Sequence, residues 1–256
     1  MLVDGSYQPP RALGRVAAMD AWGAALTERG GALFPASAAL LAGDRLPNIE
    51  QQVVLVRNGL DVRFWNTLTI VGKIEARGAF IALVPVPDLQ AVIVEDISGM
   101  AIDRLATGLL KAHSIDEGGI PDQGIGGHDE MWFAARDLAF GPEAYPDVEP
   151  QPGLAREDVT RYLPEVSEEI EQILSFIANV LIIEFRAEIG FAETQAVLTT
   201  PGLFGERAAD AALGAEIVGR IRTDEEIHVR SLSLHLGELS NVTFRTLEGG
   251  TIAGSK

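Results

Sequence analysis

The most apolar stretch of the chain, residues 173–183, carries hydrophobic residues on every side of a helix. A helix without a polar face is normally buried all round. Glu184 follows directly and Glu188 lies one helical turn further on, so both carboxylates are expected on one side of that helix. Because buried carboxylates need a cation, a metal ion or a proton beside them, the pattern predicts a buried helix over 165–199 with a compensating partner for its acids.

The first part of the chain contains two shorter patterns with helical spacing. Apolar residues at helical intervals predict a helix over 11–29, between a pair of prolines and a pair of glycines. A second, shorter helix is expected over 36–42, where Gly43 ends it. The apolar stripe of the helix over 11–29 could serve a homodimer.

Residues 47–84 combine helical and strand signals. Their apolar positions recur every three or four residues, which favours a long helix. Three β-rich stretches and three internal glycines favour strands over 53–95 instead, and this alternative remains open. A helix is predicted over 88–115, and a short one over 128–138 after a glycine-rich loop.

The segment 141–164 contains five prolines and many acids, which is typical of a surface connection. The last helix is expected to begin near Glu206 and to end near Leu247. The outline is an all-α, four-helix bundle with a long crossover and extra N-terminal helices. We expect one domain over 1–256, made of an extension (1–45), a helical hairpin (47–115), an acidic crossover (116–164) and a second hairpin (165–247).

Composition excludes several kinds of protein. The chain of 256 residues has no cysteine, which rules out disulfides and thiolate metal sites. Its net charge of −17 argues against binding to nucleic acid or to an anionic membrane surface. There is no secretory signal pattern and no long uncharged apolar stretch, so we expect a soluble, cytoplasmic protein. Residues 115–171 hold 15 of the 37 acids, which is typical of a solvated acidic surface.

The predicted last helix contains a pair of residues suited to metal binding. Glu225 and His228 are three apart, so their side chains lie on one helical face. A carboxylate and an imidazole at this spacing can hold a divalent metal ion. The helix over 165–199 would add Glu184 or Glu188 from the opposite side.

With these residues the second hairpin resembles the ferritin-like superfamily of di-iron carboxylate proteins, in which one helix of each hairpin gives a Glu and its partner gives Glu-x-x-His. In the first hairpin, Glu75 corresponds to the single Glu. The partner helix departs from the pattern, because Leu110 stands where the family has Glu. His113 and Glu117, four apart, offer a variant half-site there.

The resemblance implies two iron ions, or manganese, and an oxidase or oxygenase that uses O2 on a small organic substrate. The ligand set would be completed as Glu75, His113, Glu117, Glu184, Glu188, Glu225 and His228. The missing Glu at Leu110 favours an alternative, a metal-free bundle that binds a ligand or a protein, so enzyme activity stays open.

Several candidate ligands also have simpler interpretations. Glu184 and Glu188 could pair with Arg186, Arg220 or Arg230. Glu225 and His228 could belong to a solvent-facing acidic turn, and His113 with Glu117 to an exposed helix end. His128, at the start of a short helix, is more typical of a cap, and His235 of a hydrogen-bonded core histidine.

Overall fold

The computed structural model describes residues 2–3, 6–7, 12–151 and 161–256. Expectations that fall on the other residues, such as the part of the proline-rich segment over 152–160, lie outside this description. The described chain is all-α apart from two short antiparallel hairpins. Their strands are β1 (Leu2–Val3), β2 (Ser6–Tyr7), β3 (Thr243–Arg245) and β4 (Thr251–Ala253). No helix among the described residues is long and apolar enough to cross a membrane.

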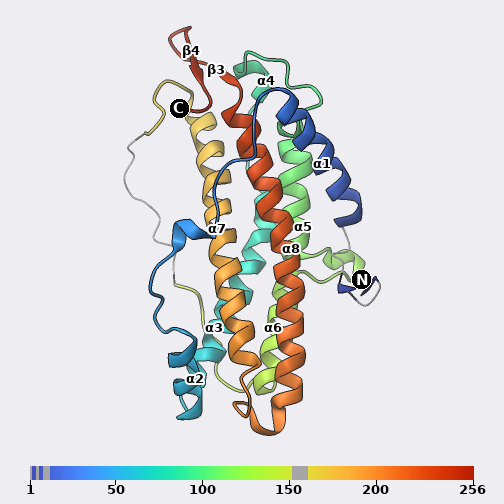
Figure 1. The fold of residues 1–256 in the computed structure, drawn as a ribbon, viewed down its shortest axis with the longest axis vertical. Coiled ribbons are helices and arrows are strands. Elements are labelled where there is room, and N and C mark those ends of the chain that lie inside the picture. The colour runs from blue at the N-terminus through green and yellow to red at the C-terminus, as the bar shows by residue number, and fades with distance from the viewer. Residues whose placement is uncertain (1, 4–5, 8–11, 152–160) are drawn as a thin grey trace.

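Two long antiparallel helices form one side of the bundle in Figure 1 and pack along each other. These are α7 (Glu168–Leu198) and α8 (Ala208–Ser240), joined by a short connection that includes the 3-10 turn η6 (Gly205–Arg207). Both helices were predicted from the sequence and are present, but the predicted end of the second near Leu247 is wrong, since α8 ends at Ser240 and the chain continues into β3. The helix predicted over 11–29 is α1 (Ala12–Glu28), which lies outside the bundle against α8.

The long helix favoured over 47–84 is helical but interrupted, and the strand alternative is wrong. It consists of α2 (Ile49–Arg57), α3 (Val62–Gly78) and the 3-10 turn η2 (Ala79–Leu83). The break falls at Gly59, whose φ of 73° is readily adopted only by glycine. The side chain of Asn48 caps α2 by accepting a hydrogen bond from Gln51 N. The short helix expected over 36–42 is a single 3-10 turn, η1 (Ala38–Leu41).

The single helix predicted over 88–115 is wrong. After the short helix α4 (Leu89–Val92) the chain extends, and Ile93 forms a β-bridge with Phe244. Gly99, with a φ of 81°, turns the chain back into the bundle. The helical elements that follow are the 3-10 turn η3 (Ala101–Arg104), the π-helix η4 (Leu105–Leu110) and α5 (Lys111–Gly118).

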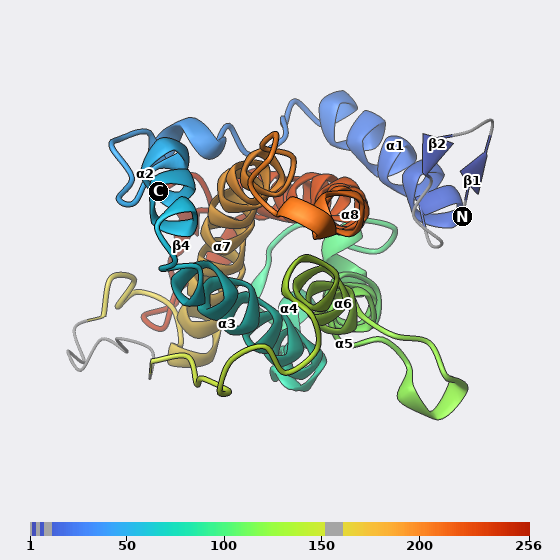
Figure 2. The same ribbon diagram turned by 90° about the horizontal axis from the view of Figure 1, so that it is seen from below.

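The fourth long side of the bundle is a helix in two pieces. The helix α6 (His128–Phe140) lies below α5 and almost in line with it in both views (Figures 1 and 2), while residues 119–127, with the 3-10 turn η5 (Pro121–Gln123), loop outward. The sequence placed this short helix inside the crossover, yet α6 packs against α3 and α8 as part of the bundle. The connection to α7 therefore begins only after Phe140.

Most of the apolar interior forms two clusters along the bundle axis, and a third, smaller cluster joins α1 to α8. One contains residues of α7 up to Phe185 and of α8 from Leu232, and the other contains residues such as Leu68, Trp132 and Ile221. Residues 224–228 of α8 fall between the two clusters, and most of them are buried. A polar layer thus crosses the bundle between two hydrophobic cores.

The sequence predicted that the apolar stretch at the start of α7 is buried on every side. This prediction is wrong. Ile177 is fully buried, whereas Ile183 keeps half of its surface exposed. Helices α2 and η1 cover only part of the outer face of α7, so Ile183 on that face reaches solvent. An exposed isoleucine on such a surface is unexceptional in folded proteins.

These two isoleucines make a matched test of the packing. Ile177→Ala removes a fully buried side chain and should lower the free energy of unfolding by about 2–5 kcal/mol. Ile183→Ala, on the same helix, should change it by less than about 1 kcal/mol. Urea unfolding of both variants, followed by circular dichroism, measures the difference, and equal losses would contradict the burial described for α7.

Candidate metal centre

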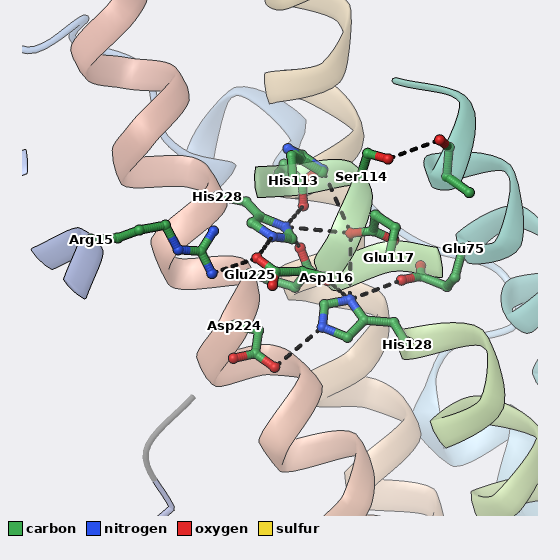
Figure 3. A network of polar contacts seen from close by, with 12 residues as sticks. Arg15, Glu75, His113, Ser114, Asp116, Glu117, His128, Asp224, Glu225 and His228 are labelled. Atoms are coloured by element: carbon green, nitrogen blue, oxygen red, sulfur yellow. Dashed lines mark hydrogen bonds and ion pairs between the residues drawn. The ribbon is translucent and has the colours of Figure 1, made fainter. Parts of the chain in front are cut away.

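Glu117, on α5, is the central residue of the polar layer. Its Oε1 atom lies 3.5 Å from His113 Nε2, 3.4 Å from His128 Nδ1 and 3.4 Å from His228 Nδ1. The three histidines come from α5, α6 and α8, and each leaves at most 3% of its surface exposed. Figure 3 shows their rings turned toward this carboxylate. One carboxylate oxygen therefore faces a nitrogen atom from each of three imidazole rings.

The first group of side chains around Glu117 contains His113, Glu184 and His228. The Oε1 atom of Glu184 lies 3.0 Å from His113 Nε2, and its Oε2 atom lies 3.9 Å from His228 Nδ1. The two imidazole rings stack at 3.9 Å between centroids. Glu184 is therefore compensated by histidines in this structure, where the sequence had also suggested arginine.

The second group contains Glu75, Glu117, His128 and Glu225. His128 Nδ1 lies 3.1 Å from Glu225 Oε1 and 3.6 Å from Glu75 Oε2. Yet His128 Nδ1 and Glu75 Oε2 are both buried without a hydrogen-bond partner. Buried polar atoms are rarely left in this state, and both atoms belong to a group that could bind a metal ion.

Two aspartates hold the outer side of the histidine rings. Asp116 Oδ2 lies 3.1 Å from His228 Nε2, and Asp224 Oδ2 lies 3.2 Å from His128 Nε2. Each aspartate directly precedes a glutamate of the cluster, Glu117 or Glu225. A carboxylate on the far nitrogen fixes the ring orientation and the tautomer, and it leaves Nδ1 facing inward as an electron-pair donor.

The charges of the cluster are strongly coupled. Burial raises the pKa of Glu75 well above its usual value, and nearby Glu117 adds to this. Burial and the charge of Glu184 raise the pKa of Glu225 to about 7. Burial opposes the charges of Glu117 and Glu184 too, but it is outweighed by the histidines around Glu117, and by a hydrogen bond with Glu225 and then by histidines at Glu184, so both pKa values lie below the usual range.

The histidines respond in the opposite direction. Burial favours neutral imidazole, but the carboxylates around His128 and His228 outweigh it and raise both pKa values well above 6.5. The pKa of His113 is raised as well, with Glu117 and Glu184 outweighing its burial. Without a metal ion, the cluster therefore compensates its carboxylates by holding protons.

The break between α5 and α6 brings the ligands of the fourth side together. Residues 119–127 form a loop whose two ends lie next to each other. A methyl group on Gly127 would therefore overlap the carbonyl oxygen of Glu117. A methyl group on Gly78, at the end of α3, would overlap Cβ and Cγ of Glu117. Ser114 anchors α5 beside this point by donating to Ala79 O at 2.8 Å. These close approaches fix the position of Glu117.

Six residues predicted from the sequence meet in the cluster, namely Glu75, His113, Glu117, Glu184, Glu225 and His228. Glu188 does not, because it is exposed on α7 one turn beyond the polar layer. Sequence reasoning undervalued His128, which it interpreted as a helix cap. His235 is buried outside both groups, with Nδ1 at 2.8 Å from Ser231 O, as expected for a core histidine.

The geometry of both groups fits a metal ion. Within each group one donor atom per residue can be chosen so that all lie within 4.8 Å of one another. Donors bound about 2.1 Å from a common ion lie up to about 4.2 Å apart, so only a small contraction is needed. Oxygen and imidazole donors without sulfur suit borderline divalent ions such as iron and manganese. The buried groups could therefore bind two metal ions that share Glu117.

Comparison with known proteins does not identify a family. The chain matches no protein-family model, and no curated protein or solved structure matches it significantly.

The close contact at Gly78 gives a test of how the cluster is built. Gly78→Ala forces a methyl group into Glu117 and should lower the free energy of unfolding by about 1–3 kcal/mol, as overpacking does. Gly23→Ala, in α1, meets open space and should leave stability unchanged or raise it by up to about 1 kcal/mol. Urea unfolding compares the two variants. A Gly78→Ala protein as stable as the wild type would contradict the tight packing around Glu117.

His235 predicts a loss of stability in acid. Burial lowers its pKa to about 4, against 6.5 for an exposed histidine. As the pH falls, His235 therefore binds a proton in the unfolded chain before it does so in the folded protein. The free energy of unfolding is lowered between pH 6.5 and about 4. The loss should reach about 3 kcal/mol.

Replacing the titrating group isolates this effect. In His235→Leu the acid-dependent loss that belongs to this site should disappear. The difference in unfolding free energy between wild type and variant should therefore shift by about 3 kcal/mol between neutral pH and pH 4. A difference that stays constant with pH would contradict the buried, neutral state of His235.

Proposed function

We propose that this chain is a metalloprotein with two divalent metal ions, iron or manganese, bound side by side and bridged by Glu117. The observation that carries the proposal is the pair of buried four-residue groups that have Glu117 in common. His113, Glu184 and His228 would complete the first ion's site, and Glu75, His128 and Glu225 the second. The proposal places the chain among ferritin-like di-metal proteins in architecture and ligand type.

Charge balance supports two ions. Four carboxylates (Glu75, Glu117, Glu184 and Glu225) give a charge of −4 when ionised, and two divalent ions supply +4. Burying four ionised carboxylates in a bundle core without compensation would be very costly, and two ions would supply the positive charge that bound protons supply in the metal-free cluster. They would also give the unpartnered Glu75 Oε2 and His128 Nδ1 a partner.

The split fourth helix would replace the usual motif. The ferritin-like pattern has Glu and His three apart on one helix, whereas Leu110 is a buried core residue here. In this chain Glu117 ends α5 and His128 begins α6, and the loop over 119–127 brings them to 3.4 Å. Like a Glu-x-x-His motif on one unbroken helix, this pair would supply a carboxylate and an imidazole from one side of the bundle.

A site of this kind supports O2-dependent oxidation of a small organic substrate, because iron or manganese in a carboxylate and imidazole environment supplies redox chemistry and open coordination positions. The protein's own contribution is positional. Asp116 and Asp224 hold the rings of His228 and His128 in the ligating orientation. The two hydrophobic cores on either side limit the access of water.

Metal stoichiometry tests the proposal. Anaerobic loading with Fe(II), followed by removal of free iron and elemental analysis, should give about two ions per chain, and loading with Mn(II) the same. His113→Ala should leave about one ion, and so should Glu75→Gln, because each removes a ligand from one group only. Glu117→Ala should lose more than either, since both groups contain this residue. The loaded wild type should consume O2.

Two glutamates of α7 provide the matched control. Glu184→Gln removes a cluster ligand and should lower metal content, whereas Glu188→Gln changes an exposed residue and should keep about two ions. Circular dichroism checks that each variant remains folded. A folded wild type that binds no metal under either loading condition would overturn the proposal and favour the metal-free binding bundle.

A further inference from the structure

A cavity of about 240 Å³ adjoins one side of the candidate metal centre. It lies between α1, the π-helix η4 and α8, and its lining includes three buried histidines, His113, His228 and His235. These histidines are at most 3% exposed, whereas Gly14, Arg104 and Thr107, which also line the cavity, are exposed. The cavity therefore runs from solvent to the edge of the first ligand group.

The cavity reaches only one of the two groups. His113 and His228 line it, while Glu75, His128 and Glu225 do not. Its roof is α1, which is attached to the centre by an ion pair of 2.6 Å between Arg15 and Asp116. A small molecule in this cavity would lie against the first group.

The lining is mainly apolar, and its charge is positive although the chain as a whole is strongly acidic. Its apolar side chains are Ala18, Met19, Trp22, Ala101, Leu109 and Ala112. No aspartate or glutamate is among the described lining residues, although the chain carries 37 acids and a charge of −17. The fully charged side chains there are Arg15 and Arg104, and only Arg15 has an ion pair within the described residues.

The volume limits the size of the occupant. A dry apolar cavity of about 150 Å³ holds benzene. In proportion, 240 Å³ accommodates about 10 non-hydrogen atoms. The apolar walls favour a hydrocarbon body, and the arginine at the exposed end favours a single anionic group there.

We propose that this cavity binds the substrate of the metal centre, a small apolar monocarboxylate, with its carboxylate at Arg104 and its hydrocarbon end against His113 and His228. The substrate role rests on the function proposed above. Carboxylate binding depends only on the cavity and is tested separately. The two inner histidines would then place the hydrocarbon end, rather than the carboxylate, beside the first ion.

Octanoate, octanol and octylamine are suitable probes, because they share one chain length and differ in charge. Calorimetry on the metal-free and the Mn(II)-loaded protein should show octanoate binding at least about fivefold more tightly than octanol. Octylamine should bind most weakly. Arg104→Gln should reduce octanoate affinity to that of octanol, whereas Arg57→Gln, on the distant helix α2, should not.

Filling the cavity should prevent binding without disturbing the metal. Ala18→Phe projects a ring into the cavity and should weaken octanoate binding at least about tenfold, with metal content unchanged. Ala21→Phe is the control, because Ala21 is exposed on the same helix and does not line the cavity. Thr107→Phe, at the mouth, is a second blocking variant in case Ala18→Phe fails to fold.

The orientation is tested with Mn(II), which broadens the NMR signals of nearby protons. In the loaded protein the terminal methyl signal of octanoate should broaden more than that of the methylene beside the carboxylate. Octanol binding as tightly as octanoate, blocking variants that bind like the wild type, or the reverse broadening order would overturn the assignment. Octanoate binding that Ala18→Phe abolishes in a protein that takes up no metal would support the carboxylate cavity and contradict the metal proposal alone.

Discussion

The need to compensate four buried carboxylates in the middle of an apolar bundle governs this structure. Glu75, Glu117, Glu184 and Glu225 come from four different helices and are each at most 9% exposed. Two hydrophobic cores enclose them from above and below, so very little of their carboxylate surface is exposed to solvent. Three histidines meet the carboxylates, and Glu75 Oε2 and His128 Nδ1 still remain without a hydrogen-bond partner. Bound cations satisfy all of these conditions together, which is why the metal interpretation explains more of the cluster than ion pairing does.

The remainder of the chain supports this layer by fixing its geometry. The break between α5 and α6 lets one side of the bundle offer His113, Glu117 and His128, and glycines at its closest approaches leave space for Glu117. The N-terminal helix α1 extends the support outward, from Arg15 to Asp116 and on to His228. The same helix covers the apolar cavity, so the part of the chain outside the bundle takes part in both the stability of the centre and access to it.

Periodicity along the chain was sufficient to predict most of α7 and α8, and the spacing of Glu225 and His228 identified one residue of each ligand group. Helix breaks were harder, because Gly99 and the bridge between Ile93 and Phe244 depend on contacts distant in sequence. His128 was undervalued for the same reason: it lies eleven positions after Glu117, and only the folded loop shows that they meet. Glu188 was included because residues four apart share a helical side, but the polar layer is about one turn thick and Glu188 lies beyond it.

The most direct test of the central claim is a crystal structure of the Mn(II)-loaded protein, with anomalous diffraction used to locate the metal. The account predicts two anomalous peaks in the polar layer, one on each side of the Glu117 carboxylate. The first should lie among His113, Glu184 and His228, and the second among Glu75, His128 and Glu225. A loaded crystal with no peak in this layer, or with peaks only at surface carboxylates such as Glu188, would contradict it.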